Sequence, residues 1–278
     1  MLKKAFLEIT NSCNLDCDFC HKTSRPTKFL TKEEFTYAAK ELRRVSEYLY
    51  FHIMGEPLLH PLLEEFFKIA GELGFKVIIT TNGTLIPKRR KILLNSPSLH
   101  KVSISLHAYE ANKMNITLDD YLDGCFDFCR EASEKGIFCI MRLWNVGGED
   151  TLNRYILDRM HKFFDGEWTK NQSGYKLCRK VFLEWGERFE WPDEDAPLCE
   201  NSHSCYGLRN QVGVLSDGRV VPCCLDADGV LTLGNIFEDK IEDILASPRA
   251  VALKTSFENR KITEPLCLRC DFAARRVK

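Results

Sequence analysis

Three cysteines near the N-terminus could do chemistry together: Cys13, Cys17 and Cys20 form a CxxxCxxC run. Three thiolates in one loop can bind three irons of a cubane cluster, whereas full ligation by protein needs four. The remaining iron would then be open to a small molecule. Structural zinc usually takes four ligands in two pairs, and His21 adjoins Cys20 too closely to reach the same ion. The spacing therefore favours an open iron–sulfur cluster, with zinc or plain buried cysteines as the alternatives.

An aromatic residue, Phe19, directly precedes the third cysteine. With this residue the loop resembles the signature of the radical S-adenosylmethionine (radical SAM) superfamily. The resemblance implies a [4Fe-4S] cluster whose unique iron binds the amino and carboxylate groups of S-adenosylmethionine. It also implies reductive cleavage to a 5′-deoxyadenosyl radical, which abstracts hydrogen from a substrate. In such enzymes the cofactor supplies the difficult chemistry and the protein orients it.

The elements that must position this loop follow a strand–helix rhythm. Near-continuous apolar strands that alternate with amphipathic helices predict a parallel sheet covered by helices. Strands are expected at residues 5–10, 48–53, 76–80, 102–106, 137–143 and 181–185. Helices are expected at residues 31–48, 61–73, 88–94, 121–135 and 150–164, the first with a capping box at Thr31 and the last capped by Asp150.

Periodicity leaves an open sheet and a curved barrel as alternatives, and the family resemblance implies a partial (βα)6 barrel. In either fold, ligands gather at the C-terminal ends of the strands. The cysteine loop follows the first predicted strand directly, and so lies at that end.

The second predicted strand ends at Met54-Gly55-Glu56-Pro57. A glycine before Glu-Pro suits a turn in which the backbone approaches a ligand closely, although such turns are often only structural. The position resembles the GGEP motif of the superfamily, which grips the amino group of S-adenosylmethionine. The resemblance implies that Gly55, Glu56 and Pro57 bind the cofactor, with Met54 in place of the first glycine of the motif.

Three polar residues in later strands are further candidates for cofactor binding. Ser103 and Ser105 lie on the same side of the fourth strand, where their hydroxyls either reach a ribose or make structural hydrogen bonds. Related subfamilies have Asp where this chain has His107. Arg142 interrupts an apolar strand and needs an anionic partner, either the cofactor carboxylate or an acidic side chain of a neighbouring helix.

The strand–helix rhythm stops after a linker rich in acidic residues and proline. We expect two domains, a barrel at residues 1–190 and a small module at residues 191–278. The sequence pattern of residues 212–221 predicts a hairpin with its turn at Asp217-Gly218. The fold class is therefore α/β, a partial parallel barrel with a small C-terminal domain that contains a hairpin.

The C-terminal module has four cysteines that could close a tetrahedral site: Cys205, Cys223, Cys267 and Cys270. The C-x12-G-x4-C spacing of the first two resembles the SPASM/twitch extensions of radical SAM enzymes. No cysteine follows Cys270, so the resemblance implies one auxiliary [4Fe-4S] cluster on these four residues. Zinc is the rival occupant. Cys199 or Cys224 could replace a ligand, and the roles of these two and of Cys178 stay open.

Bulk composition limits the partners. The 278 residues include 39 basic and 40 acidic side chains, a balance that suggests neither nucleic acid nor membrane as a partner. Thirteen cysteines without an export signal suit metal clusters in a reducing cytoplasm. We expect the protein to function at low oxygen, with a flavodoxin or ferredoxin as its electron donor.

Three hypotheses for the function remain. The first is modification of a peptide or protein residue, as in maturases of ribosomal peptides. Because Cys13 comes so early, a leader-peptide-binding protein would then be a separate chain. The second is a small-molecule dehydrogenase or an enzyme of cofactor biosynthesis. The third is an iron–sulfur or zinc protein without turnover.

Overall fold

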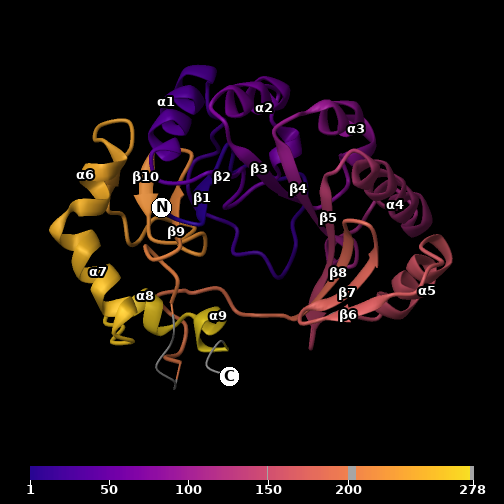
Figure 1. Cartoon of the computed structure of the whole chain (residues 1–278). Helices are drawn as coiled ribbons and strands as arrows, with labels where there is room; N and C mark the ends of the chain where they lie inside the picture. Colours follow the sequence, from indigo (N-terminus) through magenta and orange to yellow (C-terminus); the bar gives the residue numbers. More distant parts are fainter. Residues whose placement is uncertain (149, 200–204, 276–278) are drawn as a thin grey trace.

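A single curved sheet organises the chain (Figure 1). The computed structural model describes residues 1–148, 150–199 and 205–275. The strand order is β11-β10-β9-β1-β2-β3-β4-β5-β8-β7-β6. The central strands β1, β2, β3, β4, β5 and β8 pair in parallel. This confirms the α/β prediction with a parallel central sheet.

The secondary structure has the following bounds. The strands are β1 (Lys4–Leu7), β2 (Tyr48–Tyr50), β3 (Lys76–Thr81), β4 (Leu99–Ser105), β5 (Phe138–Val146), β6 (Thr169–Asn171), β7 (Gly174–Cys178), β8 (Val181–Glu187), β9 (Gln211–Val214), β10 (Arg219–Val221) and β11 (Gly234–Asn235). The helices are α1 (Lys32–Arg43), α2 (Leu63–Glu72), α3 (Ile86–Asn95), α4 (Leu118–Glu134), α5 (Asn153–Phe163), α6 (Ile241–Ala246), α7 (Pro248–Glu258), α8 (Pro265–Leu268) and α9 (Asp271–Ala274).

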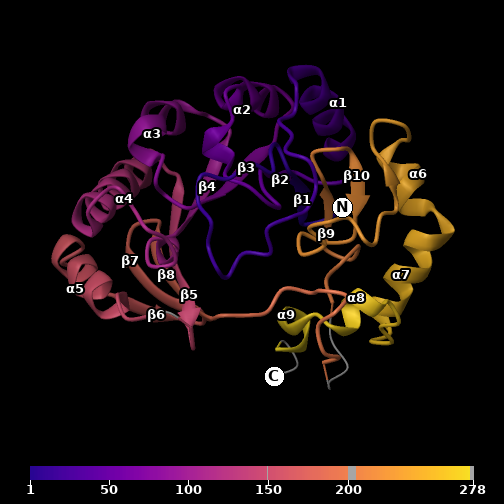
Figure 2. The same cartoon turned by 180° about the vertical axis from the view of Figure 1, so that it is seen from behind.

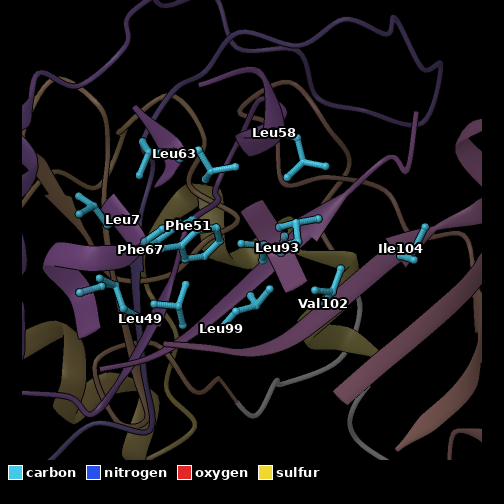
Figure 3. Packing of buried hydrophobic residues seen from close by; sticks show 14 of the residues in the cluster. Leu7, Leu49, Phe51, Leu58, Leu63, Phe67, Leu93, Leu99, Val102 and Ile104 are labelled. Carbon is cyan, nitrogen blue, oxygen red and sulfur yellow. The ribbon is translucent and has the colours of Figure 1, made fainter. Parts of the chain in front are cut away.

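The helices cover the outer face of the sheet and leave its inner face for a ligand. Helices α1 to α5 follow the convex side in both views (Figures 1 and 2). Between helices and strands lies the main apolar core, in which Leu7, Phe51 and Val102 pack with Leu63 and Leu93 (Figure 3). Burial of each such side chain contributes about 1.5–3 kcal/mol, so the core holds the strand ends in place.

Two predicted helix boundaries were wrong. Helix α1 has the predicted capping box at Thr31 but ends at Arg43, because the buried Ser46 hydroxyl bonds to the backbone of Tyr48 and starts the next strand. Helix α5 begins at Asn153, and the predicted cap Asp150 offers only its backbone carbonyl. The carboxylate of Glu110 from another loop accepts hydrogen bonds from residues 151 and 152 instead.

The β6–β7 hairpin was not predicted. It is antiparallel and extends the sheet beyond β8. Its strands are short, and β6 is exposed throughout, so they lack the apolar alternation from which strands are usually predicted. The Asn171 and Gly174 residues of its turn were the available signal.

The C-terminal module continues the barrel sheet. The predicted hairpin is present as β9 and β10, with Gly218 at a φ of +90° in its turn. Strand β9 also pairs in parallel with β1, so the hairpin extends the sheet on the side opposite to β6. The boundary at residue 190 stays a prediction, and residues 276–278 of the predicted module lie outside the described residues.

Candidate active site

The cysteine loop is held at the C-terminal end of β1 by the turn that follows β2. Gly55 has a φ of +76°, and a Cβ atom there would lie 2.5 Å from the carbonyl oxygen of Thr10 and 2.8 Å from that of Ser12. The backbone nitrogen of Glu56 donates to the Ser12 carbonyl at 2.8 Å. Only glycine permits this approach, so the turn at residues 54–57 fixes the first part of the loop.

The Glu56 side chain is turned into the protein. It is 1% exposed, and its carboxylate accepts hydrogen bonds from the backbone nitrogens of Leu58 at 2.9 Å and Asn82 at 2.8 Å. Burial raises the pKa of this carboxyl to about 7. The side chain thus joins the ends of β2 and β3, while the backbone of Gly55 and Glu56 borders the loop. Cofactor contact by Gly55, Glu56 and Pro57 stays a prediction.

Amide groups of the cysteine loop itself and of loops that follow other strands reach the N-terminal thiols. The Nδ2 atom of Asn112 donates to Cys17 Sγ at 3.1 Å, and the Leu15 backbone nitrogen donates to Cys13 Sγ at 3.5 Å. The Nδ2 atom of Asn82 lies 3.9 Å from Cys13 Sγ. Burial raises the pKa of Cys17 to about 11, and the Asn112 contact opposes that rise. N–H groups directed at sulfur suit the thiolates of an iron–sulfur cluster.

Phe19 is fixed by an imidazole. Its ring centroid lies 4.8 Å from that of His107, whose Nδ1 atom lies 3.1 Å from the Arg142 carbonyl oxygen. Burial lowers the pKa of His107 to about 4, so the ring is neutral near pH 7. His107 thus contacts both Phe19 and the middle of β5.

A cavity of about 900 Å³ lies on the inner face of the sheet. Its lining includes the predicted Ser103, Ser105 and Arg142, together with Phe19 beside Cys20. This volume is at the upper end of the roughly 300–1,000 Å³ of small-molecule sites. The structure thus brings these predicted cofactor residues to one space.

Arg142 has a carboxylate partner on a strand, whereas the sequence left the cofactor carboxylate and an acidic side chain of a helix as alternatives. Its Nε atom lies 3.3 Å from an oxygen of Glu184 in the adjacent strand β8. Its guanidinium carbon lies 4.6 Å from the ring centroid of Trp144. Burial lowers the pKa of Arg142, and the Glu184 charge opposes that fall.

The four predicted C-terminal cysteines also come together. Burial raises the pKa of Cys223, and the charges of Cys224, Cys205, Cys267 and Cys270 raise it further. Cys205, Cys223 and Cys270 line the same cavity as Phe19. The Cys205 thiol accepts a hydrogen bond from the Gly207 backbone nitrogen at 3.3 Å.

The two cysteines of undecided role lie close to this set. Cys224 also lines the cavity, and its charge acts on Tyr50. The backbone nitrogen of Cys199 donates to the Leu268 carbonyl at 2.9 Å, and its charge acts on Cys270. Both could therefore serve as alternative ligands. Cys178 lies apart from them, exposed on β7.

The donor chemistry fits iron–sulfur clusters. All thirteen cysteines are free thiols. Within the described residues, no three thiol, imidazole or carboxylate groups are close enough to surround a single metal ion. A cubane cluster binds each thiolate to a different iron, so its ligands need not converge on one point.

A family model gives the decisive comparison. The model described as the radical SAM superfamily matches residues 7–153, which include the last residue of β1, the cysteine loop and strands β2 to β5. The chain belongs to the radical SAM superfamily. A second model, SPASM, described as an iron-sulfur cluster-binding domain, matches residues 205–271 and covers the four C-terminal cysteines.

Individual relatives span nearly the whole chain. A probable GTP 3′,8-cyclase of Methanocella arvoryzae is 24% identical over 93% of this chain and 94% of its own. The crystal structure of BtrN in complex with AdoMet and 2-DOIA is 19% identical, with a TM-score of 0.59 over 98% of this chain and 93% of BtrN. Streptococcus suis SuiB bound to precursor peptide SuiA is 16% identical, with a TM-score of 0.55 over 99% and 70%.

Membership of this superfamily carries its cofactors. The radical SAM domain binds a [4Fe-4S] cluster and S-adenosylmethionine, and the C-terminal domain binds auxiliary iron–sulfur clusters. No helix within the described ranges is long and apolar enough to cross a membrane.

Sequence reasoning missed the amides that reach the thiols. Asn82 was not among the candidate residues, although its position after a parallel strand was a usable signal. Asn112 stands in a loop without a motif, and nothing in its surroundings predicts contact with Cys17.

Proposed function

We propose that this radical SAM enzyme abstracts hydrogen from a residue of a peptide or protein bound in the inner cavity. The observation that carries the proposal is that one cavity borders both cysteine sets, at Phe19 on one side and at Cys205, Cys223 and Cys270 on the other. When bound, the cluster and S-adenosylmethionine supply a 5′-deoxyadenosyl radical. A substrate in this space lies between the two sites.

The chain's own residues bind and orient the cluster and S-adenosylmethionine. Cys13, Cys17 and Cys20 hold the first cluster, and the turn at residues 54–57 borders the amino group of S-adenosylmethionine. Ser105 at the end of β4 and Arg142 in the middle of β5 face the cavity and are suited to its ribose and carboxylate. Phe19 and His107 cover one side of the site and exclude water from it.

The C-terminal module holds one auxiliary [4Fe-4S] cluster on Cys205, Cys223, Cys267 and Cys270. Four thiolates would complete its ligation and leave no iron open to the substrate, so the group would supply electron transfer at these residues. An external flavodoxin or ferredoxin supplies the reducing electron. This assignment is supported by the mutual influence of the four thiols and by their match to an iron-sulfur cluster-binding domain.

A peptide substrate is supported by the side chains around the cavity. Trp144, Phe189, Trp191 and Phe272 line it with apolar surface, which suits the side chains of a peptide. SuiB, which has the same fold, is described with a bound precursor peptide. A separate chain that binds the leader peptide would complete such a system.

A small-molecule substrate is the second candidate. It is favoured by the Methanocella relative, whose name specifies GTP, and by the similar length of the two chains. The basic groups of the cavity, Lys3, Lys4, Arg142 and Arg188, also suit an anionic metabolite.

Anaerobic reconstitution tests the function. With dithionite and S-adenosylmethionine, wild-type protein should form 5′-deoxyadenosine, and the triple Cys13→Ala, Cys17→Ala, Cys20→Ala variant should form none. Cys178→Ala, at an exposed thiol outside the cavity, is the matched control and should retain formation. Zinc in place of iron, or no 5′-deoxyadenosine from wild type, would contradict the proposal. A candidate peptide that stimulates formation and changes mass supports the first candidate over the second.

A further inference from the structure

A stripe of alternating rings and ammonium groups crosses the sheet at its N-terminal edge. Lys76 Nζ lies 5.3 Å from the ring centroid of Tyr48, and Lys180 Nζ lies 4.7 Å from that of Phe138. The His100 ring joins the two pairs, because its centroid lies 5.8 Å from that of Tyr48 and 5.3 Å from that of Phe138. We call these five residues the basal stripe. They come from the beginnings of β2, β3, β4 and β5 and from the residue before β8.

The basal stripe lies at the edge of the sheet opposite to the cysteine loop. Lys76 is the first residue of β3, and Asn82, which reaches Cys13 Sγ, directly follows that strand. The distance from Lys76 to Asn82 is therefore about 20 Å along the strand. The residues of the stripe are not among those that line the inner cavity. The stripe is thus a surface separate from the candidate active site.

Positive charge exceeds negative charge around the stripe. The segments that enter β3, β4, β5 and β8 add three further basic residues, Lys101, Lys135 and Arg179. The acidic residues of these segments and of the one that enters β2 are Glu47, Glu72 and Glu134. Among the described residues, no carboxylate forms an ion pair with Lys76 or Lys180, and Lys180 donates only to the Gly136 carbonyl. Burial and the nearby lysines lower the pKa of His100, so the ring between the two ammonium groups is neutral at pH 7.

The rings of the stripe are flanked by other groups, which decides the kind of anion that fits. Tyr48 lies between the Lys76 ammonium and the His100 imidazole. Phe138 lies between that imidazole and the Phe182 ring, whose centroid is 6.4 Å away. Single-stranded nucleic acid needs open aromatic faces on which its bases stack. The stripe offers ammonium groups in place of such faces, and these suit the carboxylates of an acidic peptide.

The spacing of the two ammonium groups matches an extended peptide. Lys76 enters β3 and Lys180 enters β8, and β4 and β5 lie between these strands. Three strand spacings of about 4.8 Å, roughly 14 Å in all, therefore separate the two lysines. An extended chain advances about 3.3 Å per residue, so about four residues cover this distance. Side chains four residues apart project to the same side of an extended chain, and two carboxylates at that spacing can reach both ammonium groups.

We propose that the basal stripe docks an extended acidic segment of the peptide substrate, with carboxylates about four residues apart opposite Lys76 and Lys180. The inference rests on the proposed function, because it takes the docked peptide to be the substrate. The docked segment lies about 20 Å from the cysteine loop, so it is a part of the substrate that does not react. The stripe then adds affinity for the substrate without contact with the reacting residue.

Fluorescence anisotropy of the reconstituted holoprotein with fluorescein-labelled octaglutamate tests this surface. Wild type should bind the probe at low salt and lose it as salt rises, whereas labelled octaglutamine should not bind. The double variant Lys76→Glu, Lys180→Glu should weaken binding about tenfold, equivalent to 1.4 kcal/mol. The double variant Lys68→Glu, Lys91→Glu is the matched control. It changes the net charge equally at exposed positions of α2 and α3, and should bind within about twofold of wild type.

The outcomes separate this proposal from the proposed function. The proposal is overturned if wild type does not bind octaglutamate, or if the stripe variant and the control variant bind it equally. It is also overturned if labelled oligothymidylate binds wild type more tightly and depends on the same lysines. Lys76→Glu alone changes an exposed side chain, so it decides the matter if the double variant does not fold. Formation of 5′-deoxyadenosine by wild type is measured alongside, and its absence overturns the proposed function while the binding data stand.

Discussion

Arg25 and Glu8 form a buried bidentate ion pair beneath the cysteine loop. The Arg25 Nη2 atom lies 2.7 and 2.8 Å from the two carboxylate oxygens of Glu8, and the side chains are 6% and 0% exposed. Glu8 also accepts hydrogen bonds from the Met54 and Ser216 backbone nitrogens, and Arg25 donates to the Ala227 carbonyl. The pair thus joins the cysteine loop to β1, to the turn after β2 and to the C-terminal module.

Loss of the arginine should therefore destabilise the whole assembly. Removing one partner of a buried ion pair leaves an uncompensated charge and costs about 3–5 kcal/mol. We expect Arg25→Met to lower the free energy of unfolding by this amount in anaerobic denaturant titrations. The exposed pair of Lys32 and Glu65 is the control, because Lys32→Met should cost under about 1 kcal/mol. Equal losses in the two variants would contradict a linking role for Arg25.

Gly55 and Gly74 form a matched pair for testing contact with the cysteine loop. Their φ angles are +76° and +77°, so alanine carries the same backbone strain of about 1–2 kcal/mol at either position. At Gly74 the nearest atom to a new Cβ is 3.9 Å away, whereas at Gly55 it is the Thr10 carbonyl oxygen at 2.5 Å. Gly55→Ala should displace the loop and lower the iron bound after reconstitution, while Gly74→Ala should bind iron normally.

Iron and sulfide analysis of the two purified variants measures this difference. The free energy of unfolding of each apoprotein shows whether the backbone strain is equal. Full iron content in Gly55→Ala would show that the loop tolerates the added methyl group, and that the turn at residues 54–57 does not set its position.

Local patterns predicted the fold and the two cysteine sets. The strands around Val77 and Ile140 contain apolar runs, from which a parallel sheet was predicted. The end of β1 places Cys13 at the C-terminal edge of that sheet. The signal for the hairpin turn was also local, because the turn needs a positive φ at residue 218 and glycine adopts one readily. These features depend on residues close together in the sequence.

Features that depend on long-range contacts were not predictable. The ion pair of Arg25 with Glu8 and the contact of Asn112 with Cys17 join loops whose positions follow only from the folded sheet. The sequence placed Ser103 on the inner side of β4, but the lack of a partner for its hydroxyl emerges only with the neighbouring strands present. For Arg142 the sequence left the cofactor carboxylate and an acidic side chain of a neighbouring helix as alternatives, and its contact with Glu184 of β8 emerges only in the folded sheet.

Asn112 should raise the reduction potential of the first cluster. Its amide donates to Cys17 Sγ at 3.1 Å, and its side-chain oxygen accepts from the Asp16 backbone nitrogen at 2.9 Å. Hydrogen bonds to cluster sulfurs stabilise the more negative, reduced state. A bond to a charged group is worth about 1.5 kcal/mol or more, which corresponds to roughly 60 mV for one electron. Asn112→Ala should lower the potential by this order.

Redox titration followed by electron paramagnetic resonance measures that shift. Asn95→Ala, at the exposed end of α3, is the control and should leave the potential unchanged. An unchanged potential in Asn112→Ala at full iron content would show that its amide does not act on the cluster.

His60 should make stability fall at acidic pH. It is fully buried, its Nδ1 atom accepts from the Leu62 backbone nitrogen at 3.1 Å, and its Nε2 atom donates to the Leu30 carbonyl at 3.1 Å. Burial lowers its pKa from 6.5 to about 4. In the unfolded chain His60 therefore binds a proton below about pH 6.5, whereas in the folded chain it does so only below about pH 4. Stability present above pH 6.5 is lost as the pH falls through this window.

Between pH 7.5 and 5.5 this single group should cost about 1.3 kcal/mol of unfolding free energy. His60→Gln keeps one donor and one acceptor but cannot titrate, so its stability should fall less than that of wild type over the same interval. His161→Gln is the control, because His161 is exposed on α5 and should leave the wild-type pH dependence intact. Denaturant titrations at the two pH values measure the loss of unfolding free energy for each protein. An equal loss in wild type and His60→Gln would show that His60 does not cause the acid sensitivity.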